Sequence, residues 1–205
     1  MSAETAATIA SRISEAGYTG LFLSGDHNRA ATIWHQGAHR GQLEQIVQSS
    51  QYDDLTRILA SEILYAQAPD YPPPDWADTL GYLYARALAI TADTSGPLQL
   101  TGNAWGFMYH TDTLGVTDYG QLGTHLVAVG PAAVPYLSQL LANTDVIFYE
   151  GSKEATVGNS FAYRVKDAAA YFIGKITGTP VAFHKKNRDR DAEIERLKAT
   201  LRGTR

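Results

Sequence analysis

The chain contains no cysteine among its 205 residues. This absence excludes disulfide scaffolds, thiolate metal sites and cysteine nucleophiles. No apolar run approaches the roughly 18–20 residues that a membrane-spanning helix needs, so we expect a soluble chain without a membrane span. A Gly-x-Ser-x-Gly elbow and a phosphate loop ending in Gly-Lys-Ser/Thr are also missing. Together these absences favour a protein that binds over one that catalyses a reaction.

Positive charge is scarce over most of the chain. The 17 Lys and Arg residues stand against 21 Asp and Glu residues, which gives a net charge of −4. The broad positive field of a protein that binds nucleic acid over much of its surface is therefore absent. The segment His184–Arg205 is an exception, because it carries eight basic and four acidic residues. It can dock an acidic partner or a phosphate, or it can be a solvated helix with pairs such as Glu193 and Arg196.

The first residues, Met1–Glu4, lack the basic and apolar segments of a signal peptide. As written, the sequence predicts a cytoplasmic protein. Removal of a signal peptide would leave the same pattern, so the sequence does not fix the compartment.

Apolar residues recur at helical spacing through most of the chain. Between Gln51 and Pro69 they share one face of a predicted helix, with Arg57 and Glu62 pointing outward. Over residues 161–176 they recur at intervals of four, three, four and four. No run of alternating residues predicts a strand. We therefore expect an all-α fold of paired antiparallel helices.

Two segments of the second half carry a family resemblance. Residues 125–141 read HLVAVGPAAVPYLSQLL, in which one helix ends at Gly130 and the next opens with Val-Pro-x-Leu. Residues 164–178 read RVKDAAAYFIGKITG, with small alanines before a final Gly178. These segments resemble HEAT-type helical repeats over about 80 residues. The separation of Gly130 and Gly178 is slightly more than the length of one such repeat, about 40–47 residues. The resemblance implies stacked helix pairs that present a surface.

We therefore expect a single helical domain over residues 1–205. It would comprise an N-terminal helical extension (1–50), a helix pair (51–92) and degenerate HEAT-like helix pairs (119–201). Residues 93–118 and 145–159 show no regular pattern and are expected to be long loops, which in a compact domain are usually functional.

The favoured function is a non-enzymatic binding or scaffold module without a cofactor, which presents a protein- or peptide-binding surface around loops 101–113 and 148–160. Trp and Tyr dominate the energetics of such surfaces, and charged side chains nearby add specificity. The candidate binding residues are Trp105, Tyr109, Tyr149, Glu150, Arg164 and Lys166. Alternatively, the aromatic residues fill the core beneath the two loops.

A metal-dependent enzyme or metal-binding protein is the alternative function. His110, Asp112 and His125 could supply three ligands to a divalent metal, with Glu150 as a fourth ligand or a base. The competing interpretation is that Asp112 stabilises a turn and His125 packs within its helix.

Residues 151–166 allow a third hypothesis, an anion site at the start of a helix that begins near Phe161. The competing interpretation is that Asn159 or Ser160 caps this helix. Arg164 and Asp167 lie three residues apart and are expected to form an ordinary helix pair.

Overall fold

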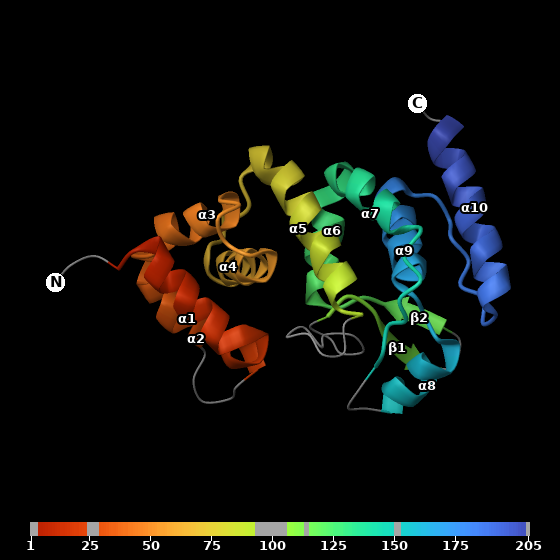
Figure 1. Ribbon diagram of the computed structural model, residues 1–205, viewed down its shortest axis with the longest axis horizontal. Coiled ribbons are helices and arrows are strands. Elements are labelled where there is room, and N and C mark those ends of the chain that lie inside the picture. The colour runs from red at the N-terminus through yellow and green to blue at the C-terminus, as the bar shows by residue number, and fades with distance from the viewer. Residues whose placement is uncertain (1–3, 24–28, 93–105, 113–114, 150–152, 204–205) are drawn as a thin grey trace. The chain divides into compact units, whose positions relative to one another are not determined.

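The computed structural model describes residues 4–23, 29–92, 106–112, 115–149 and 153–203 (Figure 1). Over these residues the fold is helical, which confirms the all-α prediction, and one short hairpin is present in addition. The chain divides into two compact units, residues 1–79 and 80–205.

Over its described residues, the first unit is helical. In chain order its elements are α1 (Ala6–Tyr18), a π-helical turn (Thr19–Leu23), α2 (Arg29–Trp34), a 3-10 turn (His35–Gly37), α3 (Arg40–Gln48), α4 (Asp54–Gln67), a second 3-10 turn (Pro74–Trp76) and the start of α5 (Ala77–Ile90). Asp53 caps α4, because its carboxylate accepts hydrogen bonds from the N–H and the hydroxyl of Thr56 at 2.9 and 2.7 Å.

Helix α4 is buried on every side over residues 56–64. It packs against α1, α2 and α3 of the same unit (Figure 1). This corrects the expectation that Arg57 and Glu62 point outward, since Arg57 is 7% exposed and Glu62 is fully buried. The Arg57 Nε donates to the Val47 carbonyl at 3.0 Å, and Nη1 lies 3.3 Å from Asp54. A helix enclosed by neighbours has no solvent-facing side, so its polar residues need partners inside the protein.

Tyrosines near Glu62 add to this polar interior. The hydroxyls of Ser61 and Tyr71 are 2.9 Å apart and hydrogen-bonded. Burial, and after it the charge of Glu62, raises the pKa of Tyr18 and Tyr65 well above its usual range. Burial also raises the pKa of Tyr71, although its hydrogen bond to Ser61 acts in the opposite direction. These hydroxyls therefore stay protonated while the unit is folded.

The second unit contains the rest of α5 and all later elements. These are the hairpin β1 (Tyr109–Asp112) and β2 (Gly115–Asp118), α6 (Gln121–Val129), a 3-10 turn (Gly130–Ala133), α7 (Val134–Leu140), α8 (Lys153–Phe161), α9 (Val165–Thr177) and α10 (Asn187–Gly203). The two strands are antiparallel and irregular, with the pairs Tyr109–Asp118, His110–Val116 and Asp112–Gly115.

Helix α9 forms the core of this unit. It packs against α6, α7 and α10 (Figure 1), and its residues 167–174 are all buried. The glycines expected to end helices do so, because Gly130 follows α6 with φ of 73° and Gly178 follows α9 with φ of 70°. Positive φ values of this kind are strained for residues with a Cβ atom.

Three local expectations need correction. The hairpin lies in the stretch 93–118, which was expected to lack regular structure, and α8 occupies part of the expected loop 145–159. The helix expected to start near Phe161 is two helices, because the chain turns at Ala162, where φ is 47°, and α9 begins at Val165. Apolar residues on both sides of this turn are buried, which makes their spacing look like one continuous helical stripe.

Candidate functional site

The extended segment Asp145–Tyr149 lies along the turn between α8 and α9. The Ile147 N–H donates to the Tyr163 carbonyl at 2.7 Å, and the Val165 N–H donates to the Asp145 carbonyl at 2.9 Å. These bonds flank an isolated antiparallel bridge between Val146 and Arg164. The segment is therefore a short strand held on one edge by the start of α9.

Side chains of this segment alternate between the core and the solvent, as they do in a half-buried strand. Ile147 and Tyr149 point inward and are 2% and 1% exposed. Val146 and Phe148 are 51% and 47% exposed, and among the described residues only Leu23 is a further exposed large apolar side chain. Val146 and Phe148 thus place two apolar groups on one face of an extended backbone.

Helix α8 holds the end of this segment. The Asn159 side chain accepts a hydrogen bond from the Tyr149 N–H at 2.9 Å and donates one to the Tyr149 carbonyl at 2.8 Å. Gly158 lies against the Tyr149 ring so closely that a Cβ atom there would come within 2.9 Å of it. The Asn159 amide therefore acts as a strand partner would, which corrects its expected role as a helix cap.

The outer edge of the segment carries the remaining backbone groups. Because the Ile147 N–H and the Asp145 carbonyl face the α9 side, the N–H and carbonyl of Val146 face the opposite side. Within the part of the chain that the structure describes, these two groups of Val146 make no hydrogen bond. An exposed strand edge of this kind is a template for pairing with another strand.

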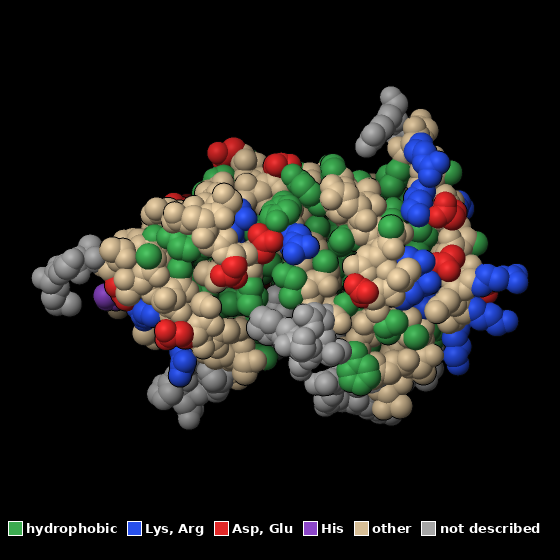
Figure 2. All heavy atoms as spheres, in the orientation of Figure 1, with side chains coloured by type: hydrophobic (Ala, Val, Ile, Leu, Met, Phe, Trp, Pro, Cys, Tyr) green, Lys and Arg blue, Asp and Glu red, His purple; other side chains and the backbone are tan. Residues whose placement is uncertain are grey.

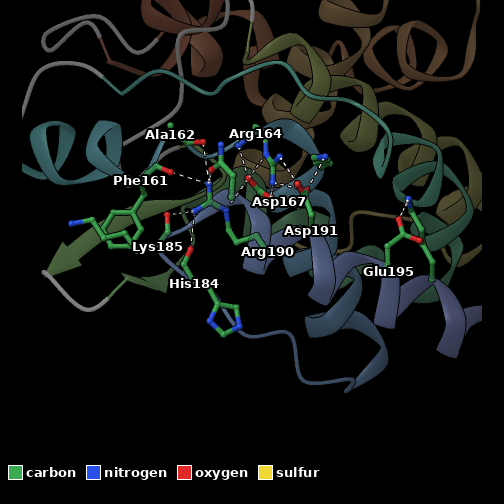
Figure 3. Close-up of polar contacts among 12 residues, drawn as sticks. Phe161, Ala162, Arg164, Asp167, His184, Lys185, Arg190, Asp191 and Glu195 are labelled. Carbon is green, nitrogen blue, oxygen red and sulfur yellow. Dashed lines mark hydrogen bonds and ion pairs between the residues drawn. The ribbon is translucent and has the colours of Figure 1, made fainter.

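A buried cluster of charges lies beneath the turn between α8 and α9 (Figure 3). Asp167 is 2% exposed, and its carboxylate accepts hydrogen bonds from the backbone N–H, Nε and Nη2 of Arg164 at 2.9, 3.0 and 2.9 Å. The Nε of Arg190, from α10, lies 3.1 Å from the same carboxylate. The expected ordinary helix pair of Arg164 and Asp167 is thus a buried capping interaction that also binds a second arginine.

Arg190 connects separate parts of the unit, as Figure 3 shows. Its Nη1 donates to the carbonyls of His184 and Lys185 at 2.7 and 3.0 Å. Its Nη2 donates to the carbonyls of Phe161 and Ala162 at 2.8 and 3.1 Å. This guanidinium, only 2% exposed, therefore ties α10 and the turn before it to the end of α8.

Asp191 forms the outer part of the cluster. One of its carboxylate oxygens lies 2.9 Å from both Arg164 Nη2 and Lys166 Nζ. Burial by itself raises the pKa of Asp191, but hydrogen bonds to Lys166 and Arg164 outweigh it and hold the pKa below its usual range. Arg164 and Lys166 are therefore already engaged by carboxylates of the chain itself.

Exposed cations surround the other side of the same turn. Lys185, Lys186 and Arg188 are exposed, and Lys185 Nζ lies 5.9 Å from the centre of the Phe161 ring. Lys and Arg side chains gather over α10 and the turn before it (Figure 2). All lysines of the chain occur at position 153 or later. The second unit therefore holds most of the positively charged side chains of the chain.

The structure brings some of the predicted binding residues together. Tyr149 lies on the extended segment that pairs with Arg164, and Arg164 and Lys166 share Asp191. Tyr149 itself is buried, so it supports the surface from inside. Trp105 and Glu150 lie outside the described residues.

The expected metal ligands are only partly described. The backbone of Tyr109, His110 and Asp112 forms β1, and their side chains lie outside the described part, as does Glu150. His125 lies on α6, with its ring edge-on to that of Tyr84 at 6.1 Å. Among the residues whose side chains are described, no group of three or more His, Asp or Glu residues could hold a metal ion. The metal hypothesis therefore stays a prediction.

Sequence reasoning did not find Val146, and it included Phe148 only as one residue of the expected loop 148–160. It treated Asp167 only as the helix partner of Arg164 and counted Arg190 only among the basic residues of the C-terminal segment. The run Val-Ile-Phe-Tyr is apolar throughout, so its in-and-out alternation is invisible in the sequence. Four residues of high strand propensity between Asp145 and Gly151 were the one available signal.

No protein-family model matches the chain, and no curated protein and no solved structure matches it. Among the described helices, none is both long and apolar enough to span a membrane.

Proposed function

We propose that the protein is a non-enzymatic binding module, and that its second unit binds an extended segment of a partner protein along the outer edge of Asp145–Tyr149. The observation that carries the proposal is the strand-like backbone with Val146 and Phe148 exposed on one face. A partner strand would pair with the backbone of Val146 and cover both side chains. Recognition by strand addition takes affinity from main-chain hydrogen bonds and specificity from alternate side chains.

The partner segment is expected to carry apolar residues at alternate positions, because those side chains would lie beside Val146 and Phe148. It is also expected to be acidic. The guanidinium of Arg190 donates both to the turn between α8 and α9 and to the basic turn at residues 184–188. The turn between α8 and α9 pairs with the extended segment on its other side. The exposed cations of residues 184–188 therefore lie beyond that turn, as seen from the segment. Complementary charge at that distance speeds association more than it strengthens binding.

The buried contacts around the segment support binding by fixing its shape. Asn159 holds both backbone groups of Tyr149, and Asp167 holds the start of α9, to which the segment is paired. A binding edge that is already ordered loses less conformational entropy when a partner adds to it.

The packing of the second unit supports a related proposal, that its helices form degenerate HEAT-like pairs. Helix α6 ends at Gly130, a 3-10 turn with Pro131 follows, and α7 and α6 both pack against α9. In such an arrangement helices mainly supply a rigid support for surface segments.

A peptide display experiment tests the proposed function. A library of random peptides of about 12 residues, enough to span the segment, is selected on the full chain, and the affinity of enriched peptides is measured by fluorescence polarisation. We expect enriched peptides to combine acidic residues with apolar residues at every second position. Val146→Pro removes the outward N–H, and proline is tolerated on strand edges that face solvent. We expect it to weaken peptide binding at least about tenfold, which equals about 1.4 kcal/mol.

Two further variants complete the test. Phe148→Ala removes an exposed ring from the segment and should weaken binding to a similar degree. Leu23→Ala removes an apolar side chain that is 39% exposed in the first unit, so it should leave the affinity unchanged. Selection of no peptide, or equal affinities for Val146→Pro and the unmodified chain, would show that the segment is not a binding edge.

A further inference from the structure

A cavity of about 300 Å³ lies between α1 and α2 of the first unit, whereas the proposed binding edge belongs to the second unit. Each helix contributes three residues at positions i, i+3 and i+4, which share one helix face. The lining residues are Arg12, Glu15 and Ala16 from α1 and Arg29, Thr32 and Ile33 from α2. The volume is at the lower end of the range for small-molecule sites.

The first unit has few basic residues, and two of them line this cavity. Residues 1–79 contain ten acidic residues, four arginines and no lysine. Arg40 is paired with Glu44 and Asp70, and Arg57 with Asp54. Half of the arginines in an acidic unit therefore line one cavity.

Arg29 differs from the other arginines of the unit. Over residues 4–23 and 29–79, which the structure describes, it makes no hydrogen bond and no ion pair. Its Nη1 lies 3.8 Å from the position that a Cβ atom would take on Gly20, which places the guanidinium over the backbone that follows α1. An arginine that has no carboxylate partner among the described residues of an acidic unit is available to an anionic ligand.

Arg12 and Glu15 complete the polar lining. Arg12 uses Nη1 for both Glu4 oxygens, at 2.9 and 2.7 Å, and its Nη2 makes no hydrogen bond among the described residues. Glu15, one turn further along α1, is exposed and has no ion pair in the described part of the chain. Acidic and basic side chains lie close together on the visible face of α1 and α2 (Figure 2). The cavity therefore offers both a cationic group and a carboxylate, one turn apart.

We propose that this cavity binds a small zwitterion, a free amino acid with an apolar side chain. The ligand carboxylate would lie between Arg29 and Arg12, where guanidinium groups can donate paired hydrogen bonds. Its ammonium group would face Glu15, and its side chain would lie on Ala16 and Ile33. A phosphate dianion suits the site less well, because Glu15 would repel it.

A titration series with matched ligands tests the proposal. The probe is L-valine, and the comparison compounds are isovalerate, which lacks the ammonium group, isobutylamine, which lacks the carboxylate, and inorganic phosphate. Binding to the full chain is followed by amide chemical shifts in the ¹H–¹⁵N NMR spectrum. We expect L-valine to shift the amide signals of Ala16, Thr32 and Ile33, and we expect these shifts to saturate at L-valine concentrations of about 10 mM or below. The comparison compounds should bind at least about tenfold more weakly.

Variants locate the binding. Arg29→Gln should weaken L-valine binding at least about tenfold, because it removes the cation proposed to bind the ligand carboxylate. Arg188→Gln makes the same change in net charge on a side chain of the second unit that is 96% exposed, and it should leave the affinity unchanged. Ala16→Leu enlarges a side chain that lines the cavity and should abolish the shifts. Phosphate that binds more tightly than L-valine, no shifts with L-valine, or equal affinities for Arg29→Gln and Arg188→Gln would each overturn the proposal.

Discussion

Replacement of Asp167 by asparagine tests whether the buried charges hold the second unit together. The carboxylate accepts three hydrogen bonds from Arg164 and lies 3.1 Å from Arg190 Nε. Asparagine keeps the size of the side chain and one carbonyl oxygen, but it has no charge. Its amide hydrogens would also face a guanidinium group. The variant therefore leaves Arg164 and Arg190, which are 7% and 2% exposed, without their shared counter-charge.

The expected loss of stability is large. Removal of one partner from a buried ion pair costs about 3–5 kcal/mol, because the remaining charge is left uncompensated. With a urea dependence of about 2 kcal/mol per molar, the unfolding midpoint should fall by roughly 1.5–2.5 M. Domains are stable by only about 5–15 kcal/mol, so a substantial part of the total would be lost.

Asp191→Asn provides the matched control. Asp191 also pairs with Arg164, at 2.9 Å, but its side chain is 45% exposed. Exposed pairs contribute about 0–1 kcal/mol, so this variant should unfold at nearly the original urea concentration. Unfolding is followed by circular dichroism, and hydrogen exchange measured by mass spectrometry identifies the affected helices. We expect faster exchange in α9 and α10 and no change in α1 to α4. Equal midpoints for the two variants would refute the argument that burial makes the Asp167 charge important.

Two further predictions concern the first unit. Asp53→Ala removes the cap of α4 and should lower the free energy of unfolding, measured by urea titration, by about 1 kcal/mol. Asp53→Asn keeps a capping oxygen and should retain most of that stability. Equal losses in both variants would argue against capping. The pKa values of Tyr18, Tyr65 and Tyr71 in the folded state are raised above the ordinary value. Their contribution to stability is therefore fully present below about pH 10 and is lost as the pH rises further. Tyrosinate absorbance should develop together with loss of helical circular dichroism, and ionisation of all tyrosines in a chain that stays helical would contradict this prediction.

Local rules predicted much of the helical framework. The glycines at 130 and 178 end helices because their positive φ values suit a residue without Cβ, and both can be read directly from the sequence. The burial of Arg57 and Glu62 could not be read in this way. It depends on which helices surround α4, and that information is distributed over α1, α2 and α3.

The candidate site was less predictable, because its contacts join residues that lie far apart in the chain. Asp167 and Arg190 are 23 positions apart, and only the fold brings them to 3.1 Å. Val146 and Phe148 stand in a run without polar residues, so their exposure depends on the pairing of Ile147 with Tyr163. Hydrophobic periodicity reports which face of an element is buried, and it fails where every residue of a segment is apolar.

The hydrogen bonds of Arg190 have a consequence for how this sequence can diverge. Its two terminal nitrogens reach carbonyl groups from two turns, and its Nε faces Asp167. Lysine has a single nitrogen at the end of its side chain, so it cannot occupy these directions at once. Related chains that keep this turn should retain arginine at the position, while the exposed Lys185, Lys186 and Arg188 are free to vary. Asp167 and Arg190 should change together or not at all.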